Sequence, residues 1–268
     1  MRILLIYLLA TLYVMAYDVT NGTVLVLEFN APQSVSLTKN GVNIPLLKHP
    51  TDAHKDIAFI AVSYRQSKPI ELLYTATQGS QKLPLHVKQG DYKKEVLSVM
   101  PAKVYPPKEA LEQIKNERDE ANKIYQTFTP KRYWSKPFNI PLQSLITSDY
   151  GNARVFNDSL QSYHSGTDFR ADVGTPIVAA NNGVVVLAKE RYYAGGSIII
   201  DHGEGVYSVY YHLSKIILHV GDVATQGGVV GLSGSTGRVT GPHLHFGFMV
   251  QGIPIDPLDF IGKINALF

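Results

Sequence analysis

Four histidines and one aspartate in the C-terminal half of the chain form a pattern that could bind a metal ion. They are His164, Asp168, His212, His243 and His245. Glycines around the first pair argue against a helix there, and residues two or four apart in an extended chain point to the same side. His164 and Asp168 are therefore expected to share one face, as are His243 and His245, so both pairs can face a common groove.

Two imidazoles and a carboxylate are ligands that catalytic zinc sites use, with a further position left open for water. Two additional histidines could move protons and stabilise charge around that water. The chain has no cysteine, which excludes a thiolate ligand, a thiol nucleophile and a disulfide framework. A single His-x-His pair on a strand is more often structural, so the hypothesis depends on the coincidence of both pairs in one glycine-rich region.

Length and composition indicate the size and kind of protein that contains this site. The chain has 268 residues, which at roughly 100–200 residues per domain predicts about two domains. A hydrophobic fraction of 45% and a charged fraction of 18% are typical of globular proteins with a sizeable core. The net charge of +3 is small and dispersed, so we expect no nucleic-acid partner.

The first residues predict export. Met1 and Arg2 precede a short apolar run that ends at the small residue Ala16, which indicates a signal peptide over residues 1–16. The run is shorter than the roughly 20 residues that span a bilayer. We expect cleavage after Ala16, and membrane association only if the segment stays uncleaved.

Residues 17–105 predict an N-terminal β-sandwich-like domain. Short β-branched and aromatic runs alternate there with turns such as Asn21-Gly22 and Asn40-Gly41, a spacing that favours antiparallel sheets. The expected strands are Val24–Phe29, Ile57–Tyr64, Ile70–Thr77, Leu83–Val87 and Glu95–Val99. A linker over residues 106–130 follows, with an amphipathic helix expected over Lys108–Phe128.

Residues 131–268 predict a second, mostly antiparallel β domain with no helix of useful length. The expected strands are Ile177–Ala180, Gly183–Ala188, Ser197–Asp201, Val206–His212 and His245–Val250. The whole chain is therefore expected to be mainly β, with the candidate site in its C-terminal domain.

The segment from Asp149 to Asp259 resembles the LytM (lysostaphin-type, M23) peptidase domain. The matching motifs, in chain order, are Asp149–Arg154, His164–Phe169, Gly174–Pro176, Ile200–Gly203, Tyr210–Ser214, Gly234–Gly237, Thr240–Phe246 and Asp256–Pro257. The N-terminal β region and linker helix are similar in outline to exported Gram-negative members of that family.

The resemblance implies a role for each candidate residue. His164, Asp168 and His245 would bind one Zn²⁺ per chain, and His212 and His243 would be the catalytic pair, one as general base and the other stabilising the oxyanion. Which histidine does which is left open. Arg154 and Tyr163 are weaker candidates for substrate contact, and a structural role explains them equally well.

The resemblance also implies the function: a zinc metallopeptidase in the periplasm that hydrolyses peptide cross-links of peptidoglycan as a D,D-endopeptidase. Two alternatives stay open, a D,D-carboxypeptidase that trims stem peptides and a catalytically inactive LytM regulator of another cell-wall hydrolase. The expected partners are peptidoglycan peptides and a regulatory protein, which would bind the N-terminal region. That region is expected to cover the groove or to bind such a protein.

Overall fold

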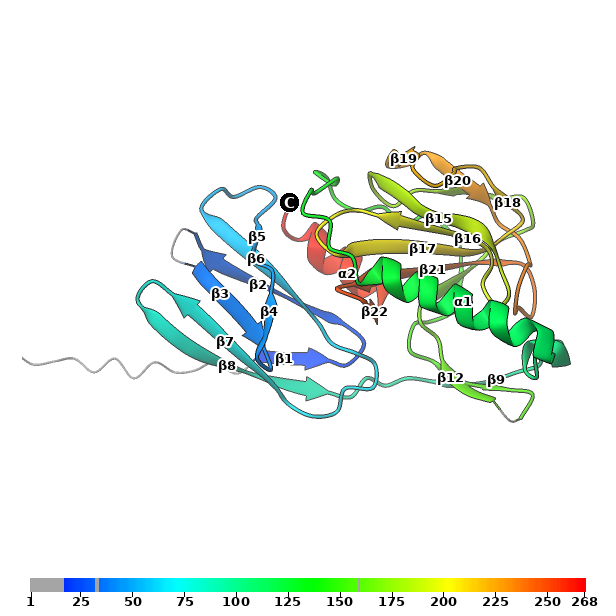
Figure 1. Ribbon diagram of the computed structural model, residues 1–268, viewed down its shortest axis with the longest axis horizontal. Coiled ribbons are helices and arrows are strands. Elements are labelled where there is room, and N and C mark those ends of the chain that lie inside the picture. The colour runs from blue at the N-terminus through cyan, green and yellow to red at the C-terminus, as the bar shows by residue number, and fades with distance from the viewer. Residues whose placement is uncertain (1–16, 32–33, 159) are drawn as a thin grey trace, which may run out of the picture.

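The computed structural model describes residues 17–31, 34–158 and 160–268. The predicted signal peptide over residues 1–16 lies outside the described residues. The described chain is mainly β with two α-helices (Figure 1), so the predicted fold class is confirmed. None of the described helices is long and apolar enough to cross a membrane.

Two sheets pack face to face in the N-terminal part of the chain. One has the strand order β1-β8-β7-β3-β4 and the other the order β2-β6-β5. Their bounds are β1 Tyr17–Thr20, β2 Val24–Asn30, β3 Ser34–Lys39, β4 Val42–Ile44, β5 Leu47–Lys48, β6 Lys55–Ala61, β7 Ile70–Ala76 and β8 Gly79–Lys88. Leu37, Ile60 and Leu85 are buried in the core between the sheets, which gives the sandwich-like arrangement that the alternating pattern predicts.

The turn between β3 and β4 shows how the sequence sets this pairing. Asn40 and Gly41 have φ angles of 50° and 80°, which is the left-handed backbone that a two-residue hairpin turn requires and that asparagine and glycine accept most readily. The turn brings Lys39 opposite Val42 in an antiparallel ladder.

The strand near residue 95 belongs to a different sheet from the one expected. β9 (Lys94–Leu97) pairs in parallel with β11 (Ala153–Phe156), which in turn pairs with β12 (Leu160–Tyr163). The β11–β12 hairpin lies beside the candidate site, so β9 carries residues from before the linker helix to that site. A 3-10 helix, η1 (Pro101–Lys103), follows β9.

The C-terminal part is built on an eight-stranded sheet and a small three-stranded sheet. The large sheet has the path β10-β13-β21-β17-β16-β15-β19, with β22 paired to β21, and the small sheet has the order β14-β20-β18. The bounds are β10 Ile146–Ser148, β13 Thr167–Arg170, β14 Pro176–Val178, β15 Gly183–Arg191, β16 Gly195–Asp201, β17 Val206–Leu213, β18 Lys215–Ile216, β19 Val223–Ala224, β20 Val229–Leu232, β21 His243–Val250 and β22 Ile253–Ile255.

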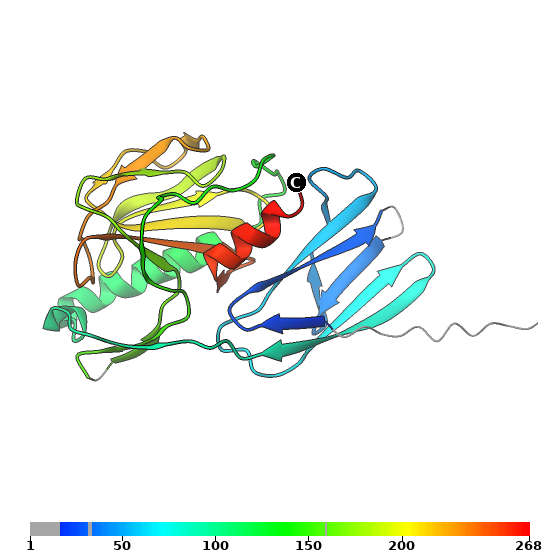
Figure 2. The ribbon, with the colours of Figure 1, turned by 180° about the vertical axis from the view of Figure 1, so that it is seen from behind.

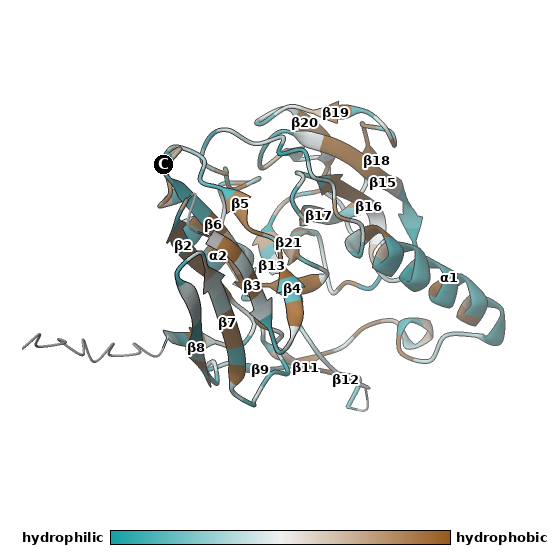
Figure 3. Ribbon diagram, turned by 60° about the vertical axis from the view of Figure 1, so that its left-hand side comes forward, coloured by the Kyte–Doolittle hydropathy of each residue, from teal (hydrophilic) through white to brown (hydrophobic). Residues whose placement is uncertain are grey.

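The linker helix α1 (Lys108–Tyr125) covers one face of the large sheet, as Figure 1 shows. Its Ala121 and Tyr125 pack against Leu187, Ile199 and Tyr207 of β15, β16 and β17. Most of the helix is hydrophilic in Figure 3, as its charged sequence predicts. The helix ends three residues before the predicted end at Phe128.

The expectation that the C-terminal part lacks a helix is wrong, because residues Pro257–Asn265 form helix α2 after the last strand. The Asp256 side chain accepts a hydrogen bond from the Leu258 amide at 2.9 Å, and Pro257 fits the first helical position, where its missing N–H would have no partner anyway. The helix has only nine residues, which is too short for a clear helical period in the sequence.

Helix α2 joins the two parts of the chain. Figure 2 shows it between the N-terminal strands and the large sheet. Phe260 and Ile264 are buried in one hydrophobic cluster with Ile57 and Phe59 of β6 and with Phe248 of β21. β6 is therefore covered on both faces, by the sandwich core on one side and by α2 on the other.

We expect Phe260→Ala to destabilise the whole chain by about 3–5 kcal/mol, because it leaves a cavity in this shared cluster. Phe128→Ala is the matched control, since Phe128 is 43% exposed and its loss should change stability by less than about 1 kcal/mol. Chemical denaturation of both variants measures the difference. Equal effects would contradict the packing described here.

His202 is part of the core of the C-terminal domain. Its ring is fully buried, its Nδ1 donates to the Asn182 carbonyl at 2.7 Å, and Phe138 packs edge-on with a centroid distance of 5.2 Å. Burial lowers the pKa of His202 to about 4.

The His202 pKa predicts a loss of stability in acid. Between pH 6.5 and 4 the unfolded chain binds a proton at this position that the folded chain does not, so stability falls as pH falls, by up to about 3 kcal/mol. We expect His202→Gln to be less stable than the parent at neutral pH and to show a flatter pH profile. A constant stability difference between the two proteins from pH 7 to pH 4 would contradict this assignment.

Candidate metal centre and active site

Strand pairing brings the predicted ligands together. β13 and β21 are antiparallel neighbours with Asp168 opposite His245, and His164 lies just before β13. The His164 Nε2 and His245 Nδ1 atoms each lie 2.9 Å from Asp168 Oδ1 and 2.9 Å from one another. Gly166 permits this approach, because a Cβ there would lie 2.4 Å from the Phe246 carbonyl oxygen.

The protonation pattern of this cluster favours a cation. The His164 Nδ1 atom lies 2.8 Å from the Asp149 carbonyl oxygen, which can only accept, so Nδ1 carries a proton and the ring is fixed with Nε2 turned toward Asp168. All three side chains are buried, and their ligand atoms lie within 4.8 Å of one another. Converging acceptors of this kind in a buried site fit a bound metal ion.

Electrostatics keep the ligands in their metal-binding protonation states. Burial would raise the pKa of Asp168, but His164 and His245 outweigh it and hold that pKa well below its ordinary value. Burial lowers the pKa of His245 to about 4 against the opposing effect of Asp168. At neutral pH the site therefore offers a carboxylate and a neutral imidazole, the forms that bind zinc.

His212 and His243 lie next to the cluster and present equivalent atoms to it. The Nδ1 atoms of His212 and His243 donate to the carbonyls of Thr236 and Gly241, each at 2.8 Å, which leaves the Nε2 atoms for other partners. The two rings are 4.8 Å apart, and His243 Nε2 lies 3.7 Å from Asp168 Oδ1. Burial lowers the pKa of His212 well below its ordinary value, with His243 and His245 adding to the effect, so this ring is neutral.

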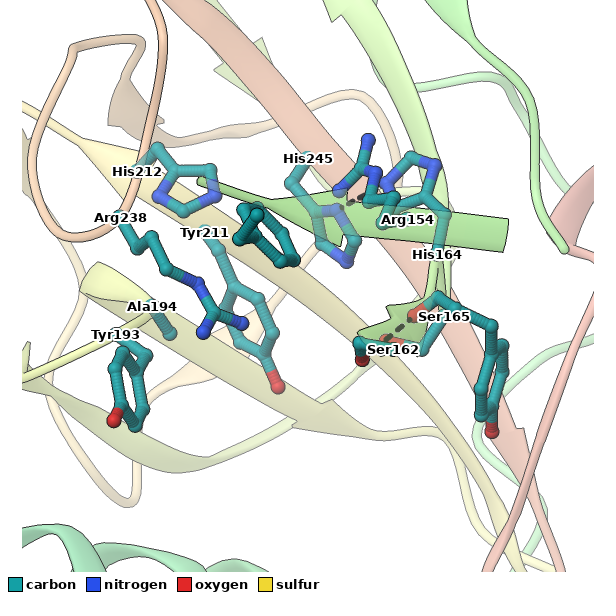
Figure 4. Close-up of a pocket in the computed structure, with 12 residues that line it drawn as sticks. Arg154, Ser162, His164, Ser165, Tyr193, Ala194, Tyr211, His212, Arg238 and His245 are labelled. Carbon is teal, nitrogen blue, oxygen red and sulfur yellow. Dashed lines mark hydrogen bonds between the residues drawn. The ribbon is translucent and has the colours of Figure 1, made fainter. Parts of the chain in front are cut away.

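The backbone at His212 is unusual for a residue near a strand end. Its φ angle is 63°, in the left-handed region that non-glycine residues seldom adopt and that is frequent at functional sites. This conformation directs the ring toward the cavity shown in Figure 4, where His212 lies across from His164 and His245.

Arg154, expected as a weaker candidate for substrate contact, lies against the ligand set. Its Nη2 atom donates to Asp168 Oδ2 at 2.7 Å and to Ser148 Oγ at 2.8 Å, and its Nε atom donates to Glu95 Oε2 at 3.0 Å. Glu95 also accepts from Ser148 Oγ at 2.8 Å and from Asn152 Nδ2 at 2.7 Å. This network holds the second oxygen of the Asp168 carboxylate and, through Ser148, the region around His164.

Sequence reasoning missed Glu95 and Ser148. Glu95 lies about 70 residues before the first predicted ligand, among the charges of a region with no chemical motif, and only the β9–β11 pairing brings it to the site. Ser148 lies just before the Asp149–Arg154 motif, and its type alone gives no signal. Burial would raise the pKa of Glu95, but hydrogen bonds from Ser148, Asn152 and Arg154 outweigh it and lower that pKa.

Two adjoining cavities open at the site. One, of about 210 Å³, is lined by His164, His212 and His245 (Figure 4). The β12 residue Tyr163 also lines it. The other, of about 140 Å³, is lined by Asp168, His212 and His243, and Glu95, Leu97 and Val99 of the segment before α1 form part of its wall. Tyr163 stacks on Tyr64 of the N-terminal part at 4.1 Å, so residues from both parts of the chain build this region.

Part of the chain is similar to known peptidases. Residues 162–257 match the model of peptidase family M23. The peptidoglycan DD-endopeptidase ShyA of Vibrio cholerae is 45% identical over 95 residues, and the DD-carboxypeptidase/endopeptidase Mpg of Neisseria meningitidis is 40% identical over 95 residues. Each of these matches covers 35% of this chain and only 22% of the relative.

One solved structure is similar over nearly the whole chain. A Pseudomonas aeruginosa protein assigned to peptidase family M23 superposes with a TM-score of 0.70 at 26% identity, covering 91% of this chain and 95% of that one. The family match over residues 162–257 therefore shows a peptidase family M23 domain in this part of the chain, and the resemblance seen in the sequence motifs is confirmed.

We expect Glu95→Gln to weaken divalent-metal binding by roughly 10- to 100-fold, the usual effect of removing a partner that orients metal ligands. Glutamine keeps the shape of the side chain but loses the charge that holds Arg154 and Ser148. Competition titration of Zn²⁺ against a chromophoric chelator measures the affinity. Glu28→Gln is the control, because Glu28 forms an exposed ion pair with Lys55 far from the site. Equal affinities in the two variants would argue against this role of Glu95.

Proposed function

We propose that this protein is a zinc-dependent peptidase that hydrolyses peptide cross-links in bacterial peptidoglycan as a D,D-endopeptidase. The observation that supports it most is the convergence of His164 Nε2, Asp168 Oδ1 and His245 Nδ1 on one buried point, with two further histidines beside it. The relatives ShyA and Mpg, which are similar to this chain over 95 residues, are named for cleavage of this kind.

The donor set fits zinc, and His164, Asp168 and His245 would hold one ion per chain. Nitrogen and carboxylate ligands from three residues are typical of catalytic zinc sites. When bound there, zinc would lower the pKa of a water molecule to about 7 and polarise the carbonyl of the scissile bond.

The chain's own residues would move the proton and stabilise charge. His212 is neutral, and because its Nδ1 proton is donated to Thr236 its Nε2 atom carries the lone pair. It can therefore accept a proton from the attacking water and pass it to the leaving amine. His243 places its Nε2 atom 3.7 Å from Asp168 Oδ1. Because its Nδ1 proton is donated to the Gly241 carbonyl, a second proton on Nε2 would let the ring donate to the carbonyl oxygen as negative charge develops there. Arg154 would keep the Asp168 carboxylate oriented, and Tyr163, on the wall of the larger cavity, would contact the substrate.

D,D-carboxypeptidase activity on uncross-linked stem peptides is the second candidate. It needs the same groups, and the relative Mpg is named for both activities. A catalytically inactive regulator fits less well, because such domains typically lose ligands, whereas all five chemical positions are present here.

Three further proposals concern the whole protein. Residues 1–16 would be a signal peptide that directs the chain to the periplasm, where peptidoglycan lies. Residues 17–105, 106–130 and 131–268 would be the N-terminal domain, the linker and the peptidase domain, although β9 crosses to the last of these. The N-terminal domain is the region that a regulatory protein partner would bind.

Asp168→Ala should lose bound zinc and should cut cross-linked muropeptides at least roughly 100-fold more slowly than the parent, because it removes a ligand from the ion. Metal analysis and mass spectrometry of digested muropeptides give both readouts, and parallel digestion of uncross-linked peptides separates endopeptidase from carboxypeptidase action. Asp222→Ala, at an exposed position beside His219, serves as the control. An Asp168→Ala variant as active as the parent would overturn the assigned site.

A further inference from the structure

Arg238 occupies a position that the roles above do not explain. It lies in the loop between β20 and β21, and its guanidinium carbon is 4.3 Å from the ring centroid of Phe156 and 4.5 Å from that of Tyr193. Figure 4 shows the side chain extending into the larger cavity on the side of His212. Arg238 also lines the smaller cavity, so it lies where the two cavities adjoin.

The charge of Arg238 lacks an acidic partner within the described part of the chain. Burial is the main effect on the pKa of Arg238 and lowers it. Tyr193 raises this pKa and Arg154 lowers it further. An arginine keeps its charge even so. Arg154 differs, because Glu95 and Asp168 already neutralise it.

Among the described residues, none accepts a hydrogen bond from the Arg238 side chain, so its donors can bind a ligand. All five N–H groups of a guanidinium lie in its plane, whereas the Phe156 and Tyr193 rings pack against it without offering a strong acceptor. A partly buried planar cation at the edge of a cavity is suited to bind the two oxygens of a carboxylate side by side.

We propose that Arg238 binds a free carboxylate of the peptide substrate, next to the scissile bond, and selects such peptides over those in which that group is an amide. The inference rests on the proposed function, because it takes the groove to be a peptide-binding site. His212, Arg154 and Phe156 line both cavities together with Arg238, so a peptide that passes His212 comes within reach of the guanidinium.

A purely structural role for Arg238 makes a different prediction. If the side chain only joined Phe156 of the β11–β12 hairpin to Tyr193, its loss would lower stability and weaken all ligands alike. If Arg238 binds a carboxylate, its substitution should lower the affinity for the carboxylate form of a ligand and leave the affinity for the matched amide form unchanged. This difference distinguishes the two roles.

The test measures binding of N-acetyl-D-alanyl-D-alanine and of its C-terminal carboxamide to the full chain after removal of metal with a chelator. We expect the parent to bind the carboxylate form about 10- to 100-fold more tightly, as charge-assisted hydrogen bonds would give. Arg238→Gln should abolish the preference, and Arg238→Lys should keep part of it. Arg118→Gln, which makes the same change of charge on the exposed side of α1, should keep all of it.

Equal binding of the two peptides by the parent, or failure of both to bind, would overturn the proposal, as would a preference that survives in Arg238→Gln. Thermal unfolding checks that each variant is folded. If Arg238→Gln is not folded, the preference for the carboxylate form is compared between Arg238→Lys and the parent instead. Hydrolysis is not measured, so a failure of this proposal and a failure of the proposed peptidase activity are told apart.

Discussion

The rest of the site depends on the convergence of three acceptor atoms on one buried point. The His164 imidazole is fixed by the Asp149 carbonyl so that its Nε2 atom faces the Asp168 carboxylate, and His245 approaches the same oxygen. Nitrogen and oxygen atoms buried this close together are unfavourable unless protons or a cation lie among them. This constraint links the fold to a metal ion more directly than any motif does.

Each layer of the structure serves to hold these atoms in place. The β13–β21 pairing sets Asp168 opposite His245, and the β9–β11 pairing brings in Glu95, which positions Arg154 against the second carboxylate oxygen. Helix α1 covers the outer face of the large sheet, and α2 fixes the N-terminal sandwich to it through a shared apolar cluster. The N-terminal part is thus structurally continuous with the peptidase domain, and its last strand supplies part of the wall of the groove.

The sequence predicted those features of the fold and the site whose signals lie in neighbouring residues. The period of two in extended chains correctly grouped His164 with Asp168 and His243 with His245, and Asn40-Gly41 marked a true hairpin. Helix α2 was missed because nine residues hold too few turns to show a period. Glu95 and Arg238, which has no acidic partner among the described residues, could not be found, because their significance arises from strand pairing and from side chains that are distant in the sequence.

The most direct test of the central claim is a crystal structure of the zinc-loaded protein with anomalous diffraction measured on both sides of the zinc absorption edge. The account predicts one anomalous peak per chain, within bonding distance of His164 Nε2, Asp168 Oδ1 and His245 Nδ1, with His212 and His243 outside its first coordination sphere. A peak at other residues, or no peak among these three, would contradict it.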